Sequence, residues 1–110
     1  MEAPYYQAAR FPTKKKAGEV YFPLQQLLLE EQGECDLSVY RIQLEQQWHV
    51  VVLGKRPSET FHLRIEVLLT TGELVSIRED MLRYLQHRRT QATQLGPWVE
   101  GHYDHSEEEQ

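Results

Sequence analysis

The seven residues at positions 48–54 restrict the possible folds more than any other part of the chain. They read Trp-His-Val-Val-Val-Leu-Gly, so apolar and β-branched residues follow one another without polar alternation, and a glycine ends the run. A strand with one face in water alternates polar and apolar residues, whereas a strand covered on both faces does not. The pattern therefore predicts an interior strand with other protein segments packed on both faces of its sheet.

The flanking segments predict three more strands and three helices. Turn residues and changes of hydrophobic period mark their ends. In the strand before the valine run, we expect Tyr40 and Ile42 to face the core and Arg41 to lie on the opposite face. The expected elements are strands at residues 5–11, 36–44, 48–53 and 74–77, helices begun by Thr13 and Ser58 and ended by Gly33 and Gly72, and a third helix that opens at Glu79 and Asp80.

Pro23 lies inside the first expected helix. An interior proline removes a backbone hydrogen bond and costs roughly 3 kcal/mol. Two structures are compatible with it: a continuous helix kinked on its solvent side, or an extended segment followed by a helix that begins at the proline. We expect the continuous helix, because an apolar stripe with helical spacing runs through the proline unbroken. Its members are Ala17, Val20, Tyr21, Leu24, Leu27 and Leu28.

The expected element order defines an α+β fold. It is a ferredoxin-like βαββαβ arrangement with a four-stranded antiparallel sheet, followed by an extra C-terminal helix. In this order of elements, residues 5–77 resemble a ferredoxin-like split βαβ domain. Only the order of elements carries the resemblance, and this architecture supports many unrelated activities. The resemblance therefore implies a fold and no reaction.

Two helices of such a domain cover one face of the sheet, so the valine run needs cover on the other face. Fully burying one Val or Leu contributes about 1.5–3 kcal/mol, which makes an exposed second face costly. The cover is either the third helix of the same chain, together with residues 98–103, or a second protein. We expect the third helix, because Leu82, Tyr84 and Leu85 make it apolar. Self-association through the sheet is the alternative.

Length and composition indicate one domain. The chain has 110 residues, a single cysteine at position 35 and no apolar run of the ~20 residues that a transmembrane helix needs. We expect a single α+β domain at residues 1–103 and a solvated acidic tail at residues 104–110, which holds Asp104 and three consecutive glutamates. Residues 1–6 lack the pattern of a secretory signal, and one cysteine suits a reducing compartment. These features predict a cytoplasmic protein.

The sequence shows no arrangement typical of a catalytic or metal centre. Cys35 and His49 could form a nucleophile and base, but the expected hairpin pairs His49 near position 43 or 44 and separates the two by roughly 20 Å or more. His102 and His105 lie three residues apart without the further ligands that a zinc site requires. Glycine-rich phosphate loops are absent as well. We expect no catalytic residue, cofactor or metal, and enzyme activity stays undecided.

Nucleic acid is a second possible partner. The net charge of −5 argues against general affinity for it, but basic residues gather locally. Arg83, Arg88 and Arg89 on the third helix, with lysines at positions 14–16, are candidate phosphate contacts. Arg88 and Arg89 also suit the negative end of that helix, which we expect to close there, before the break at residues 95–97. Aromatic residues for base stacking are missing from positions 49–53 of the valine strand.

We expect a protein partner first, before nucleic acid. Large aromatic and apolar residues are favoured at protein interfaces, and the candidates are Trp48, Val50, Val52, Trp98 and Tyr103. The sequence therefore predicts a small cytoplasmic module for protein interaction or regulation that is not an enzyme, with self-association as one form of the interaction. The alternatives are an accessory protein that contacts nucleic acid through the third helix and, in third place, a small enzyme. Membrane binding is not expected.

Overall fold

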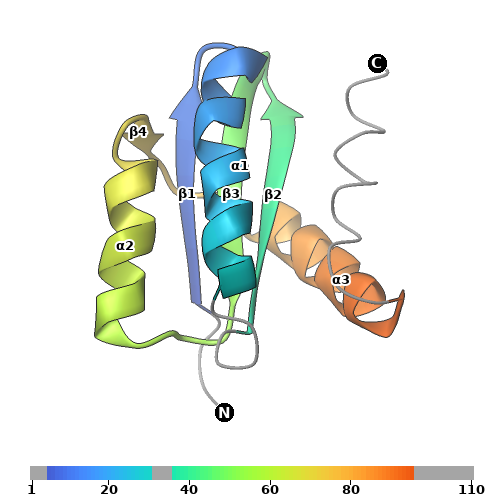
Figure 1. Cartoon of the computed structure of the whole chain (residues 1–110). Coiled ribbons are helices and arrows are strands. Elements are labelled where there is room, and N and C mark those ends of the chain that lie inside the picture. Colours follow the sequence, from blue (N-terminus) through green and yellow to red (C-terminus); the bar gives the residue numbers. More distant parts are fainter. Residues whose placement is uncertain (1–4, 31–35, 96–110) are drawn as a thin grey trace.

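The valine run forms β3 (Gln47–Gly54), an interior strand of a four-stranded antiparallel sheet. A computed structural model describes residues 5–30 and 36–95. The other strands are β1 (Tyr5–Phe11), β2 (Leu37–Leu44) and β4 (Glu73–Leu74), and the order across the sheet is β2-β3-β1-β4. Three helices complete the described residues: α1 (Lys14–Glu30), α2 (Glu59–Leu69) and α3 (Glu79–Leu95). Figure 1 shows α1 and α2 in front of the sheet and α3 emerging from behind it.

The β2–β3 hairpin has a two-residue turn. Glu45 and Gln46 have φ angles of 52° and 69°, the left-handed conformation that a tight hairpin turn uses. Leu44 therefore pairs with Gln47, and His49 pairs with Ile42. The predicted pairing of His49 with position 43 or 44 is wrong, because the turn is one residue shorter than expected.

Both faces of β3 are buried, as the sequence predicts. Val50 and Val52 belong to one core cluster, with α1 and α2, whereas Val51 and Leu53 belong to a second cluster on the opposite face. In the second cluster, Leu85 of α3 packs against the sheet. The third helix of the same chain therefore covers this part of the second face, as predicted, whereas the expected contribution of residues 98–103 lies outside the described residues.

The first helix is continuous through Pro23, which confirms the expected helix. Its N-terminus is capped by Thr13, whose Oγ1 accepts a hydrogen bond from the Lys16 amide at 3.1 Å. Pro23 lies on the exposed side of α1, opposite the apolar stripe, so its missing hydrogen bond faces water. The predicted helix end at Gly33 lies outside the described residues.

The last two elements differ from their predicted bounds. Strand β4 ends at Leu74, earlier than the predicted position 77, although the Val75 amide still donates to the Ala8 carbonyl at 3.0 Å. Val75 and Ile77 pack in the second core cluster. The third helix begins at Glu79, as predicted, but it continues to Leu95. The expectation that Arg88 and Arg89 close the helix is therefore wrong, since neither lies in its last turn.

The coarse prediction of the fold is confirmed. The described residues form an α+β fold with a four-stranded antiparallel sheet and three helices, an arrangement compatible with a ferredoxin-like domain. Two core clusters, one on each side of the sheet, hold α1 and α2 against one face and α3 against the other.

Candidate functional site

The outer surface of the helical layer exposes several large apolar side chains. On α2, Val67 is 68% exposed and Leu63 is 49% exposed, and on α1 Phe22 is 53% exposed. Single exposed apolar residues are common, but a group of them beside a groove is typical of a binding surface. These residues direct attention to the surface formed by α1 and α2.

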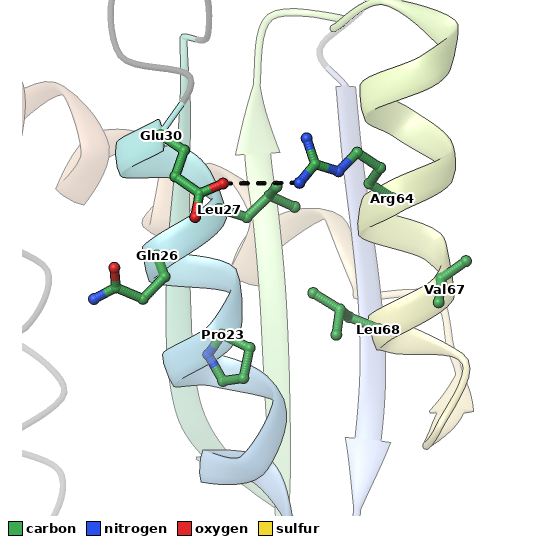
Figure 2. Close-up of a pocket in the computed structure, with 7 residues that line it drawn as sticks. All are labelled: Pro23, Gln26, Leu27, Glu30, Arg64, Val67 and Leu68. Carbon is green, nitrogen blue, oxygen red and sulfur yellow. Dashed lines mark ion pairs between the residues drawn. The ribbon is translucent and has the colours of Figure 1, made fainter.

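A groove of about 420 Å³ lies between α1 and α2. We call it the interhelical groove. Figure 2 shows Leu27 of α1 and Leu68 of α2 pointing into the space between the two helices. The groove is mainly apolar, and its full lining is Pro23, Gln26, Leu27 and Glu30 from α1 with Arg64, Val67 and Leu68 from α2.

The amphipathic pattern of α2 explains why it presents apolar residues on two sides. The helix begins after Ser58, whose Oγ accepts a hydrogen bond from the Phe61 amide at 3.2 Å. Phe61, Ile65 and Leu69 are spaced four residues apart and are buried in the first core cluster. Leu63 and Val67 have the same spacing but lie on the outer side of α2.

An ion pair crosses one end of the interhelical groove. The Arg64 guanidinium lies 3.8 Å from Oε1 of Glu30, so a side chain from α2 reaches α1 (Figure 2). Both side chains are at least half exposed, and such pairs contribute little to stability. The pair instead places one charge of each sign beside an apolar surface, where it can meet the polar rim of a bound partner.

A polar cluster joins the start of β1 to α2. The Tyr5 hydroxyl lies 2.7 Å from Nδ1 of His62, and Nε2 of His62 lies 3.8 Å from the Glu66 carboxylate. Burial, with a smaller effect of Glu66, raises the pKa of Tyr5 to about 12. The phenol is therefore neutral at pH 7 and shares a hydrogen bond with His62, which holds the two elements together.

His49 is buried on the α3 side of the sheet. Its Nδ1 atom has no hydrogen-bond partner among the described residues, and burial lowers the pKa of the imidazole. Cys35, the nucleophile considered for it, lies outside the described residues. The cross-strand neighbours of His49 are Ile42 and Arg10, an apolar residue and a cation. Neither supplies the group that a histidine base would activate.

The residues that the sequence suggested for partner binding lie in different places. Trp48, Val50 and Val52 are buried in the first core cluster beneath the helices. Trp98 and Tyr103 lie outside the described residues. The first three side chains are enclosed by the chain's own core, so the surface described above is formed by other residues.

The three candidate phosphate contacts also differ from one another. Arg83 is exposed on α3 and Arg88 is half-buried. Arg89 donates hydrogen bonds to the carbonyl and the carboxylate of Asp36, just before β2. Arg89 therefore anchors α3 to the sheet, which leaves Arg83 as the more accessible cation of the three.

Within residues 5–30 and 36–95, no three His, Cys, Asp or Glu side chains gather closely enough to hold a metal ion. In the same ranges, no helix combines the length and apolarity that crossing a bilayer demands.

Comparison of the chain with family models, with curated proteins and with solved structures found no match. The candidate site therefore depends on the geometry of this chain alone. The sequence analysis did not identify Leu63 and Val67, although their four-residue spacing on the face of α2 opposite the core residues was a readable signal.

Proposed function

We propose that the chain is a non-enzymatic interaction module that binds an amphipathic helix of a partner protein in the interhelical groove. One observation carries the proposal: exposed Val67 lines a mainly apolar groove between two helices, and exposed Leu63 lies one turn before it on α2. Apolar area that stays in water costs free energy, and a partner that covers it regains that free energy on binding.

The shape of the groove supports a helical ligand. Two adjacent helices leave a trough between them, and the apolar face of a third helix fits such a trough with anchors at i, i+3, i+4 and i+7. The volume of about 420 Å³ suits a few apolar side chains. Arg64 and Glu30, on the rim, can pair with charges on the polar side of the bound helix.

The finer description of the fold is part of the same proposal. The element order and the strand order β2-β3-β1-β4, with antiparallel neighbours, support a ferredoxin-like βαββαβ domain extended by α3. We place the domain at residues 1–103 and the acidic tail at residues 104–110. We also infer a cytoplasmic location, for which the single cysteine is the support.

The experiment begins with a photo-crosslinking amino acid at position 26, an exposed site on the groove, in the full-length chain expressed in its native cells. The same amino acid at position 55, in the exposed loop after β3, is the control. A segment cross-linked at position 26 but not at 55 is then synthesised and titrated against the full-length chain. We expect the peptide to gain helical circular dichroism on binding.

Two variants test whether the peptide binds in the interhelical groove. Val67→Glu places a charge on the groove and is expected to weaken binding about tenfold or more, equivalent to about 1.4 kcal/mol. Leu74→Glu introduces the same change at an exposed apolar residue of β4, and we expect binding to be unchanged. Equal binding by the two variants, a bound peptide without helix, or equal cross-linking at positions 26 and 55 would overturn the proposal.

A further inference from the structure

A second groove lies beside α1, between that helix and Arg41 of β2. Its volume is about 780 Å³. We call it the cationic groove, because three of its lining residues are cations and one is an acid. It is lined by Lys14, Lys15, Gly18, Glu19, Phe22, Pro23 and Arg41, and it adjoins the interhelical groove at Pro23.

Arg41 gives this groove a buried positive charge. The residue is only 6% exposed, and its guanidinium carbon lies 5.1 Å from the ring centre of Tyr21 and 5.2 Å from that of Phe22. Gly18 makes room for it, since a Cβ atom at position 18 would lie 2.9 Å from an Arg41 nitrogen. The enclosed guanidinium adds to the positive potential along this groove.

The lysines add to the same positive field. Lys14 and Lys15 occupy the first turn of α1, which contains no acidic residue. Cations are unfavourable there, because the helix dipole is positive at its N-terminus. Lys14 also places its ammonium 5.8 Å from the centre of the Trp48 ring. The groove therefore combines three cations with the ring of Phe22, and its positive charge suits a segment rich in carboxylates.

The chain itself contains such a segment. Residues 104–110 include Asp104 and glutamates at positions 107–109, and they contain no lysine or arginine. Twelve residues lead from Leu95 to Glu107, the first of the three glutamates, and an extended chain of that length reaches about 40 Å. The longest dimension of the molecule is 33 Å, so the tether is long enough to reach the groove.

We propose that the acidic segment 104–110 binds in the cationic groove of its own chain, with its carboxylates pairing with Lys14, Lys15 and Arg41. Tethering favours this occupant over the tail of a second copy, because a segment joined to its binding site within one chain has an effective concentration of about millimolar. The proposal replaces the expectation of a solvated tail, and it does not depend on the proposed function of the interhelical groove.

The test measures where the tail lies in the full-length chain. Cys35→Ser and Ser106→Cys allow one nitroxide label in the acidic segment, and the label reduces the intensity of nearby amide signals in the NMR spectrum. We expect the largest intensity loss at residues 14–22 and 41, and a smaller loss on α2. The effect should weaken at about 0.5 M salt, where charges are screened within a few ångströms.

Charge reversals supply the matched comparison. Lys14→Glu with Lys15→Glu should remove the intensity loss at α1, and additional Glu107→Lys, Glu108→Lys and Glu109→Lys changes should restore it. Lys55→Glu with Arg56→Glu makes the same change of net charge in the exposed loop after β3 and should leave the intensity loss at α1 intact. A loss of amide signal intensity that is equal in both double variants, or that centres on α3, would show the proposal to be wrong.

A mixed sample separates one chain from two. Isotope-enriched chains that carry no spin label are mixed with spin-labelled chains of natural isotopic composition. Intensity loss that is absent from this mixture supports binding within one chain. Loss of the same size in the mixture means that the tail of a second copy occupies the groove, which overturns the proposal.

Discussion

The Tyr5 hydroxyl lies 2.7 Å from Nδ1 of His62, so one hydrogen bond joins the first strand to the second helix across 57 positions of the chain. The raised pKa of Tyr5 keeps the phenol protonated over the whole neutral range. The two rings also meet edge to face, with their centres 5.6 Å apart. This pair fixes α2, and with it one wall of the interhelical groove.

Removing this hydrogen bond should lower stability without changing the fold. Tyr5→Phe keeps the ring and deletes the donor, and we expect the free energy of unfolding to fall by about 1 kcal/mol. Urea denaturation of Tyr5→Phe, His62→Ala and the double variant measures the coupling between them. Additive losses would mean that the two side chains do not interact.

Stability should fall in mild acid because of His49. Burial lowers the pKa of His49 in the folded protein below its ordinary value of 6.5, so the folded state binds the proton less readily than the unfolded chain. The contribution of His49 to the free energy of unfolding is therefore complete above about pH 6.5 and is lost as the pH falls below that value. Urea midpoints between about pH 5 and 8 should show this loss.

The His49 effect is separable from that of other histidines. His49→Gln should flatten the dependence of stability on pH in mild acid, because the group that titrates is removed. His87→Gln alters an exposed residue of α3 and should leave the dependence as it is. A steep acid loss that persists in His49→Gln would assign the effect to another group.

Two glycines should respond differently to alanine. Gly54 has φ 151°, and a Cβ atom there would collide with the Asp36 carbonyl oxygen, a backbone atom that cannot move cheaply. At Gly18 the nearest atom is the flexible end of Arg41, and alanine favours the helix. We expect Gly54→Ala to cost about 1–3 kcal/mol and Gly18→Ala to change stability by less than about 1 kcal/mol. Thermal unfolding measured side by side checks the difference.

The main-chain architecture was predictable because several local signals agree. Aromatic residues and Pro12 define the bounds of β1, and the unbroken apolar run predicts that β3 is covered on both faces. The apolar stripe through Pro23 identifies one continuous helix. Each of these signals lies within a short segment, and none depends on knowing which distant residue packs against it.

The candidate grooves were not predictable, because they depend on pairs of elements. Arg41 reads as a polar residue on the solvent side of its strand, yet α1 covers that face and leaves the side chain 6% exposed. The spacing of Leu63 and Val67 places them opposite the core residues of α2, but only the position of α1 shows that Val67 borders a groove. The two-residue turn likewise pairs His49 with Ile42, whereas the sequence predicted a pairing with position 43 or 44.

Replacing Pro23 should stabilise the protein. Its position inside α1 removes a backbone donor at a cost of about 3 kcal/mol, and the lower entropy of the unfolded chain offsets part of this cost. We expect Pro23→Ala to raise the free energy of unfolding by about 2 kcal/mol. Pro12→Ala, before the helix, should have a small effect of the opposite sign, of about 0.5 kcal/mol. Destabilisation by Pro23→Ala would mean that the proline has a tertiary role that outweighs its cost in the helix.

We expect Leu85 to contribute more than any other side chain to covering the second face of the sheet. It is fully buried where α3 meets Val51 and Leu53, and Leu85→Ala should cost about 2–5 kcal/mol. Arg83→Ala removes an exposed side chain from the same helix and should change stability by less than about 0.5 kcal/mol. Urea denaturation at low and high protein concentration completes the measurement. Cover by the chain's own helix requires midpoints that do not depend on concentration, whereas a midpoint that rises with concentration would mean that a second copy contributes to this core.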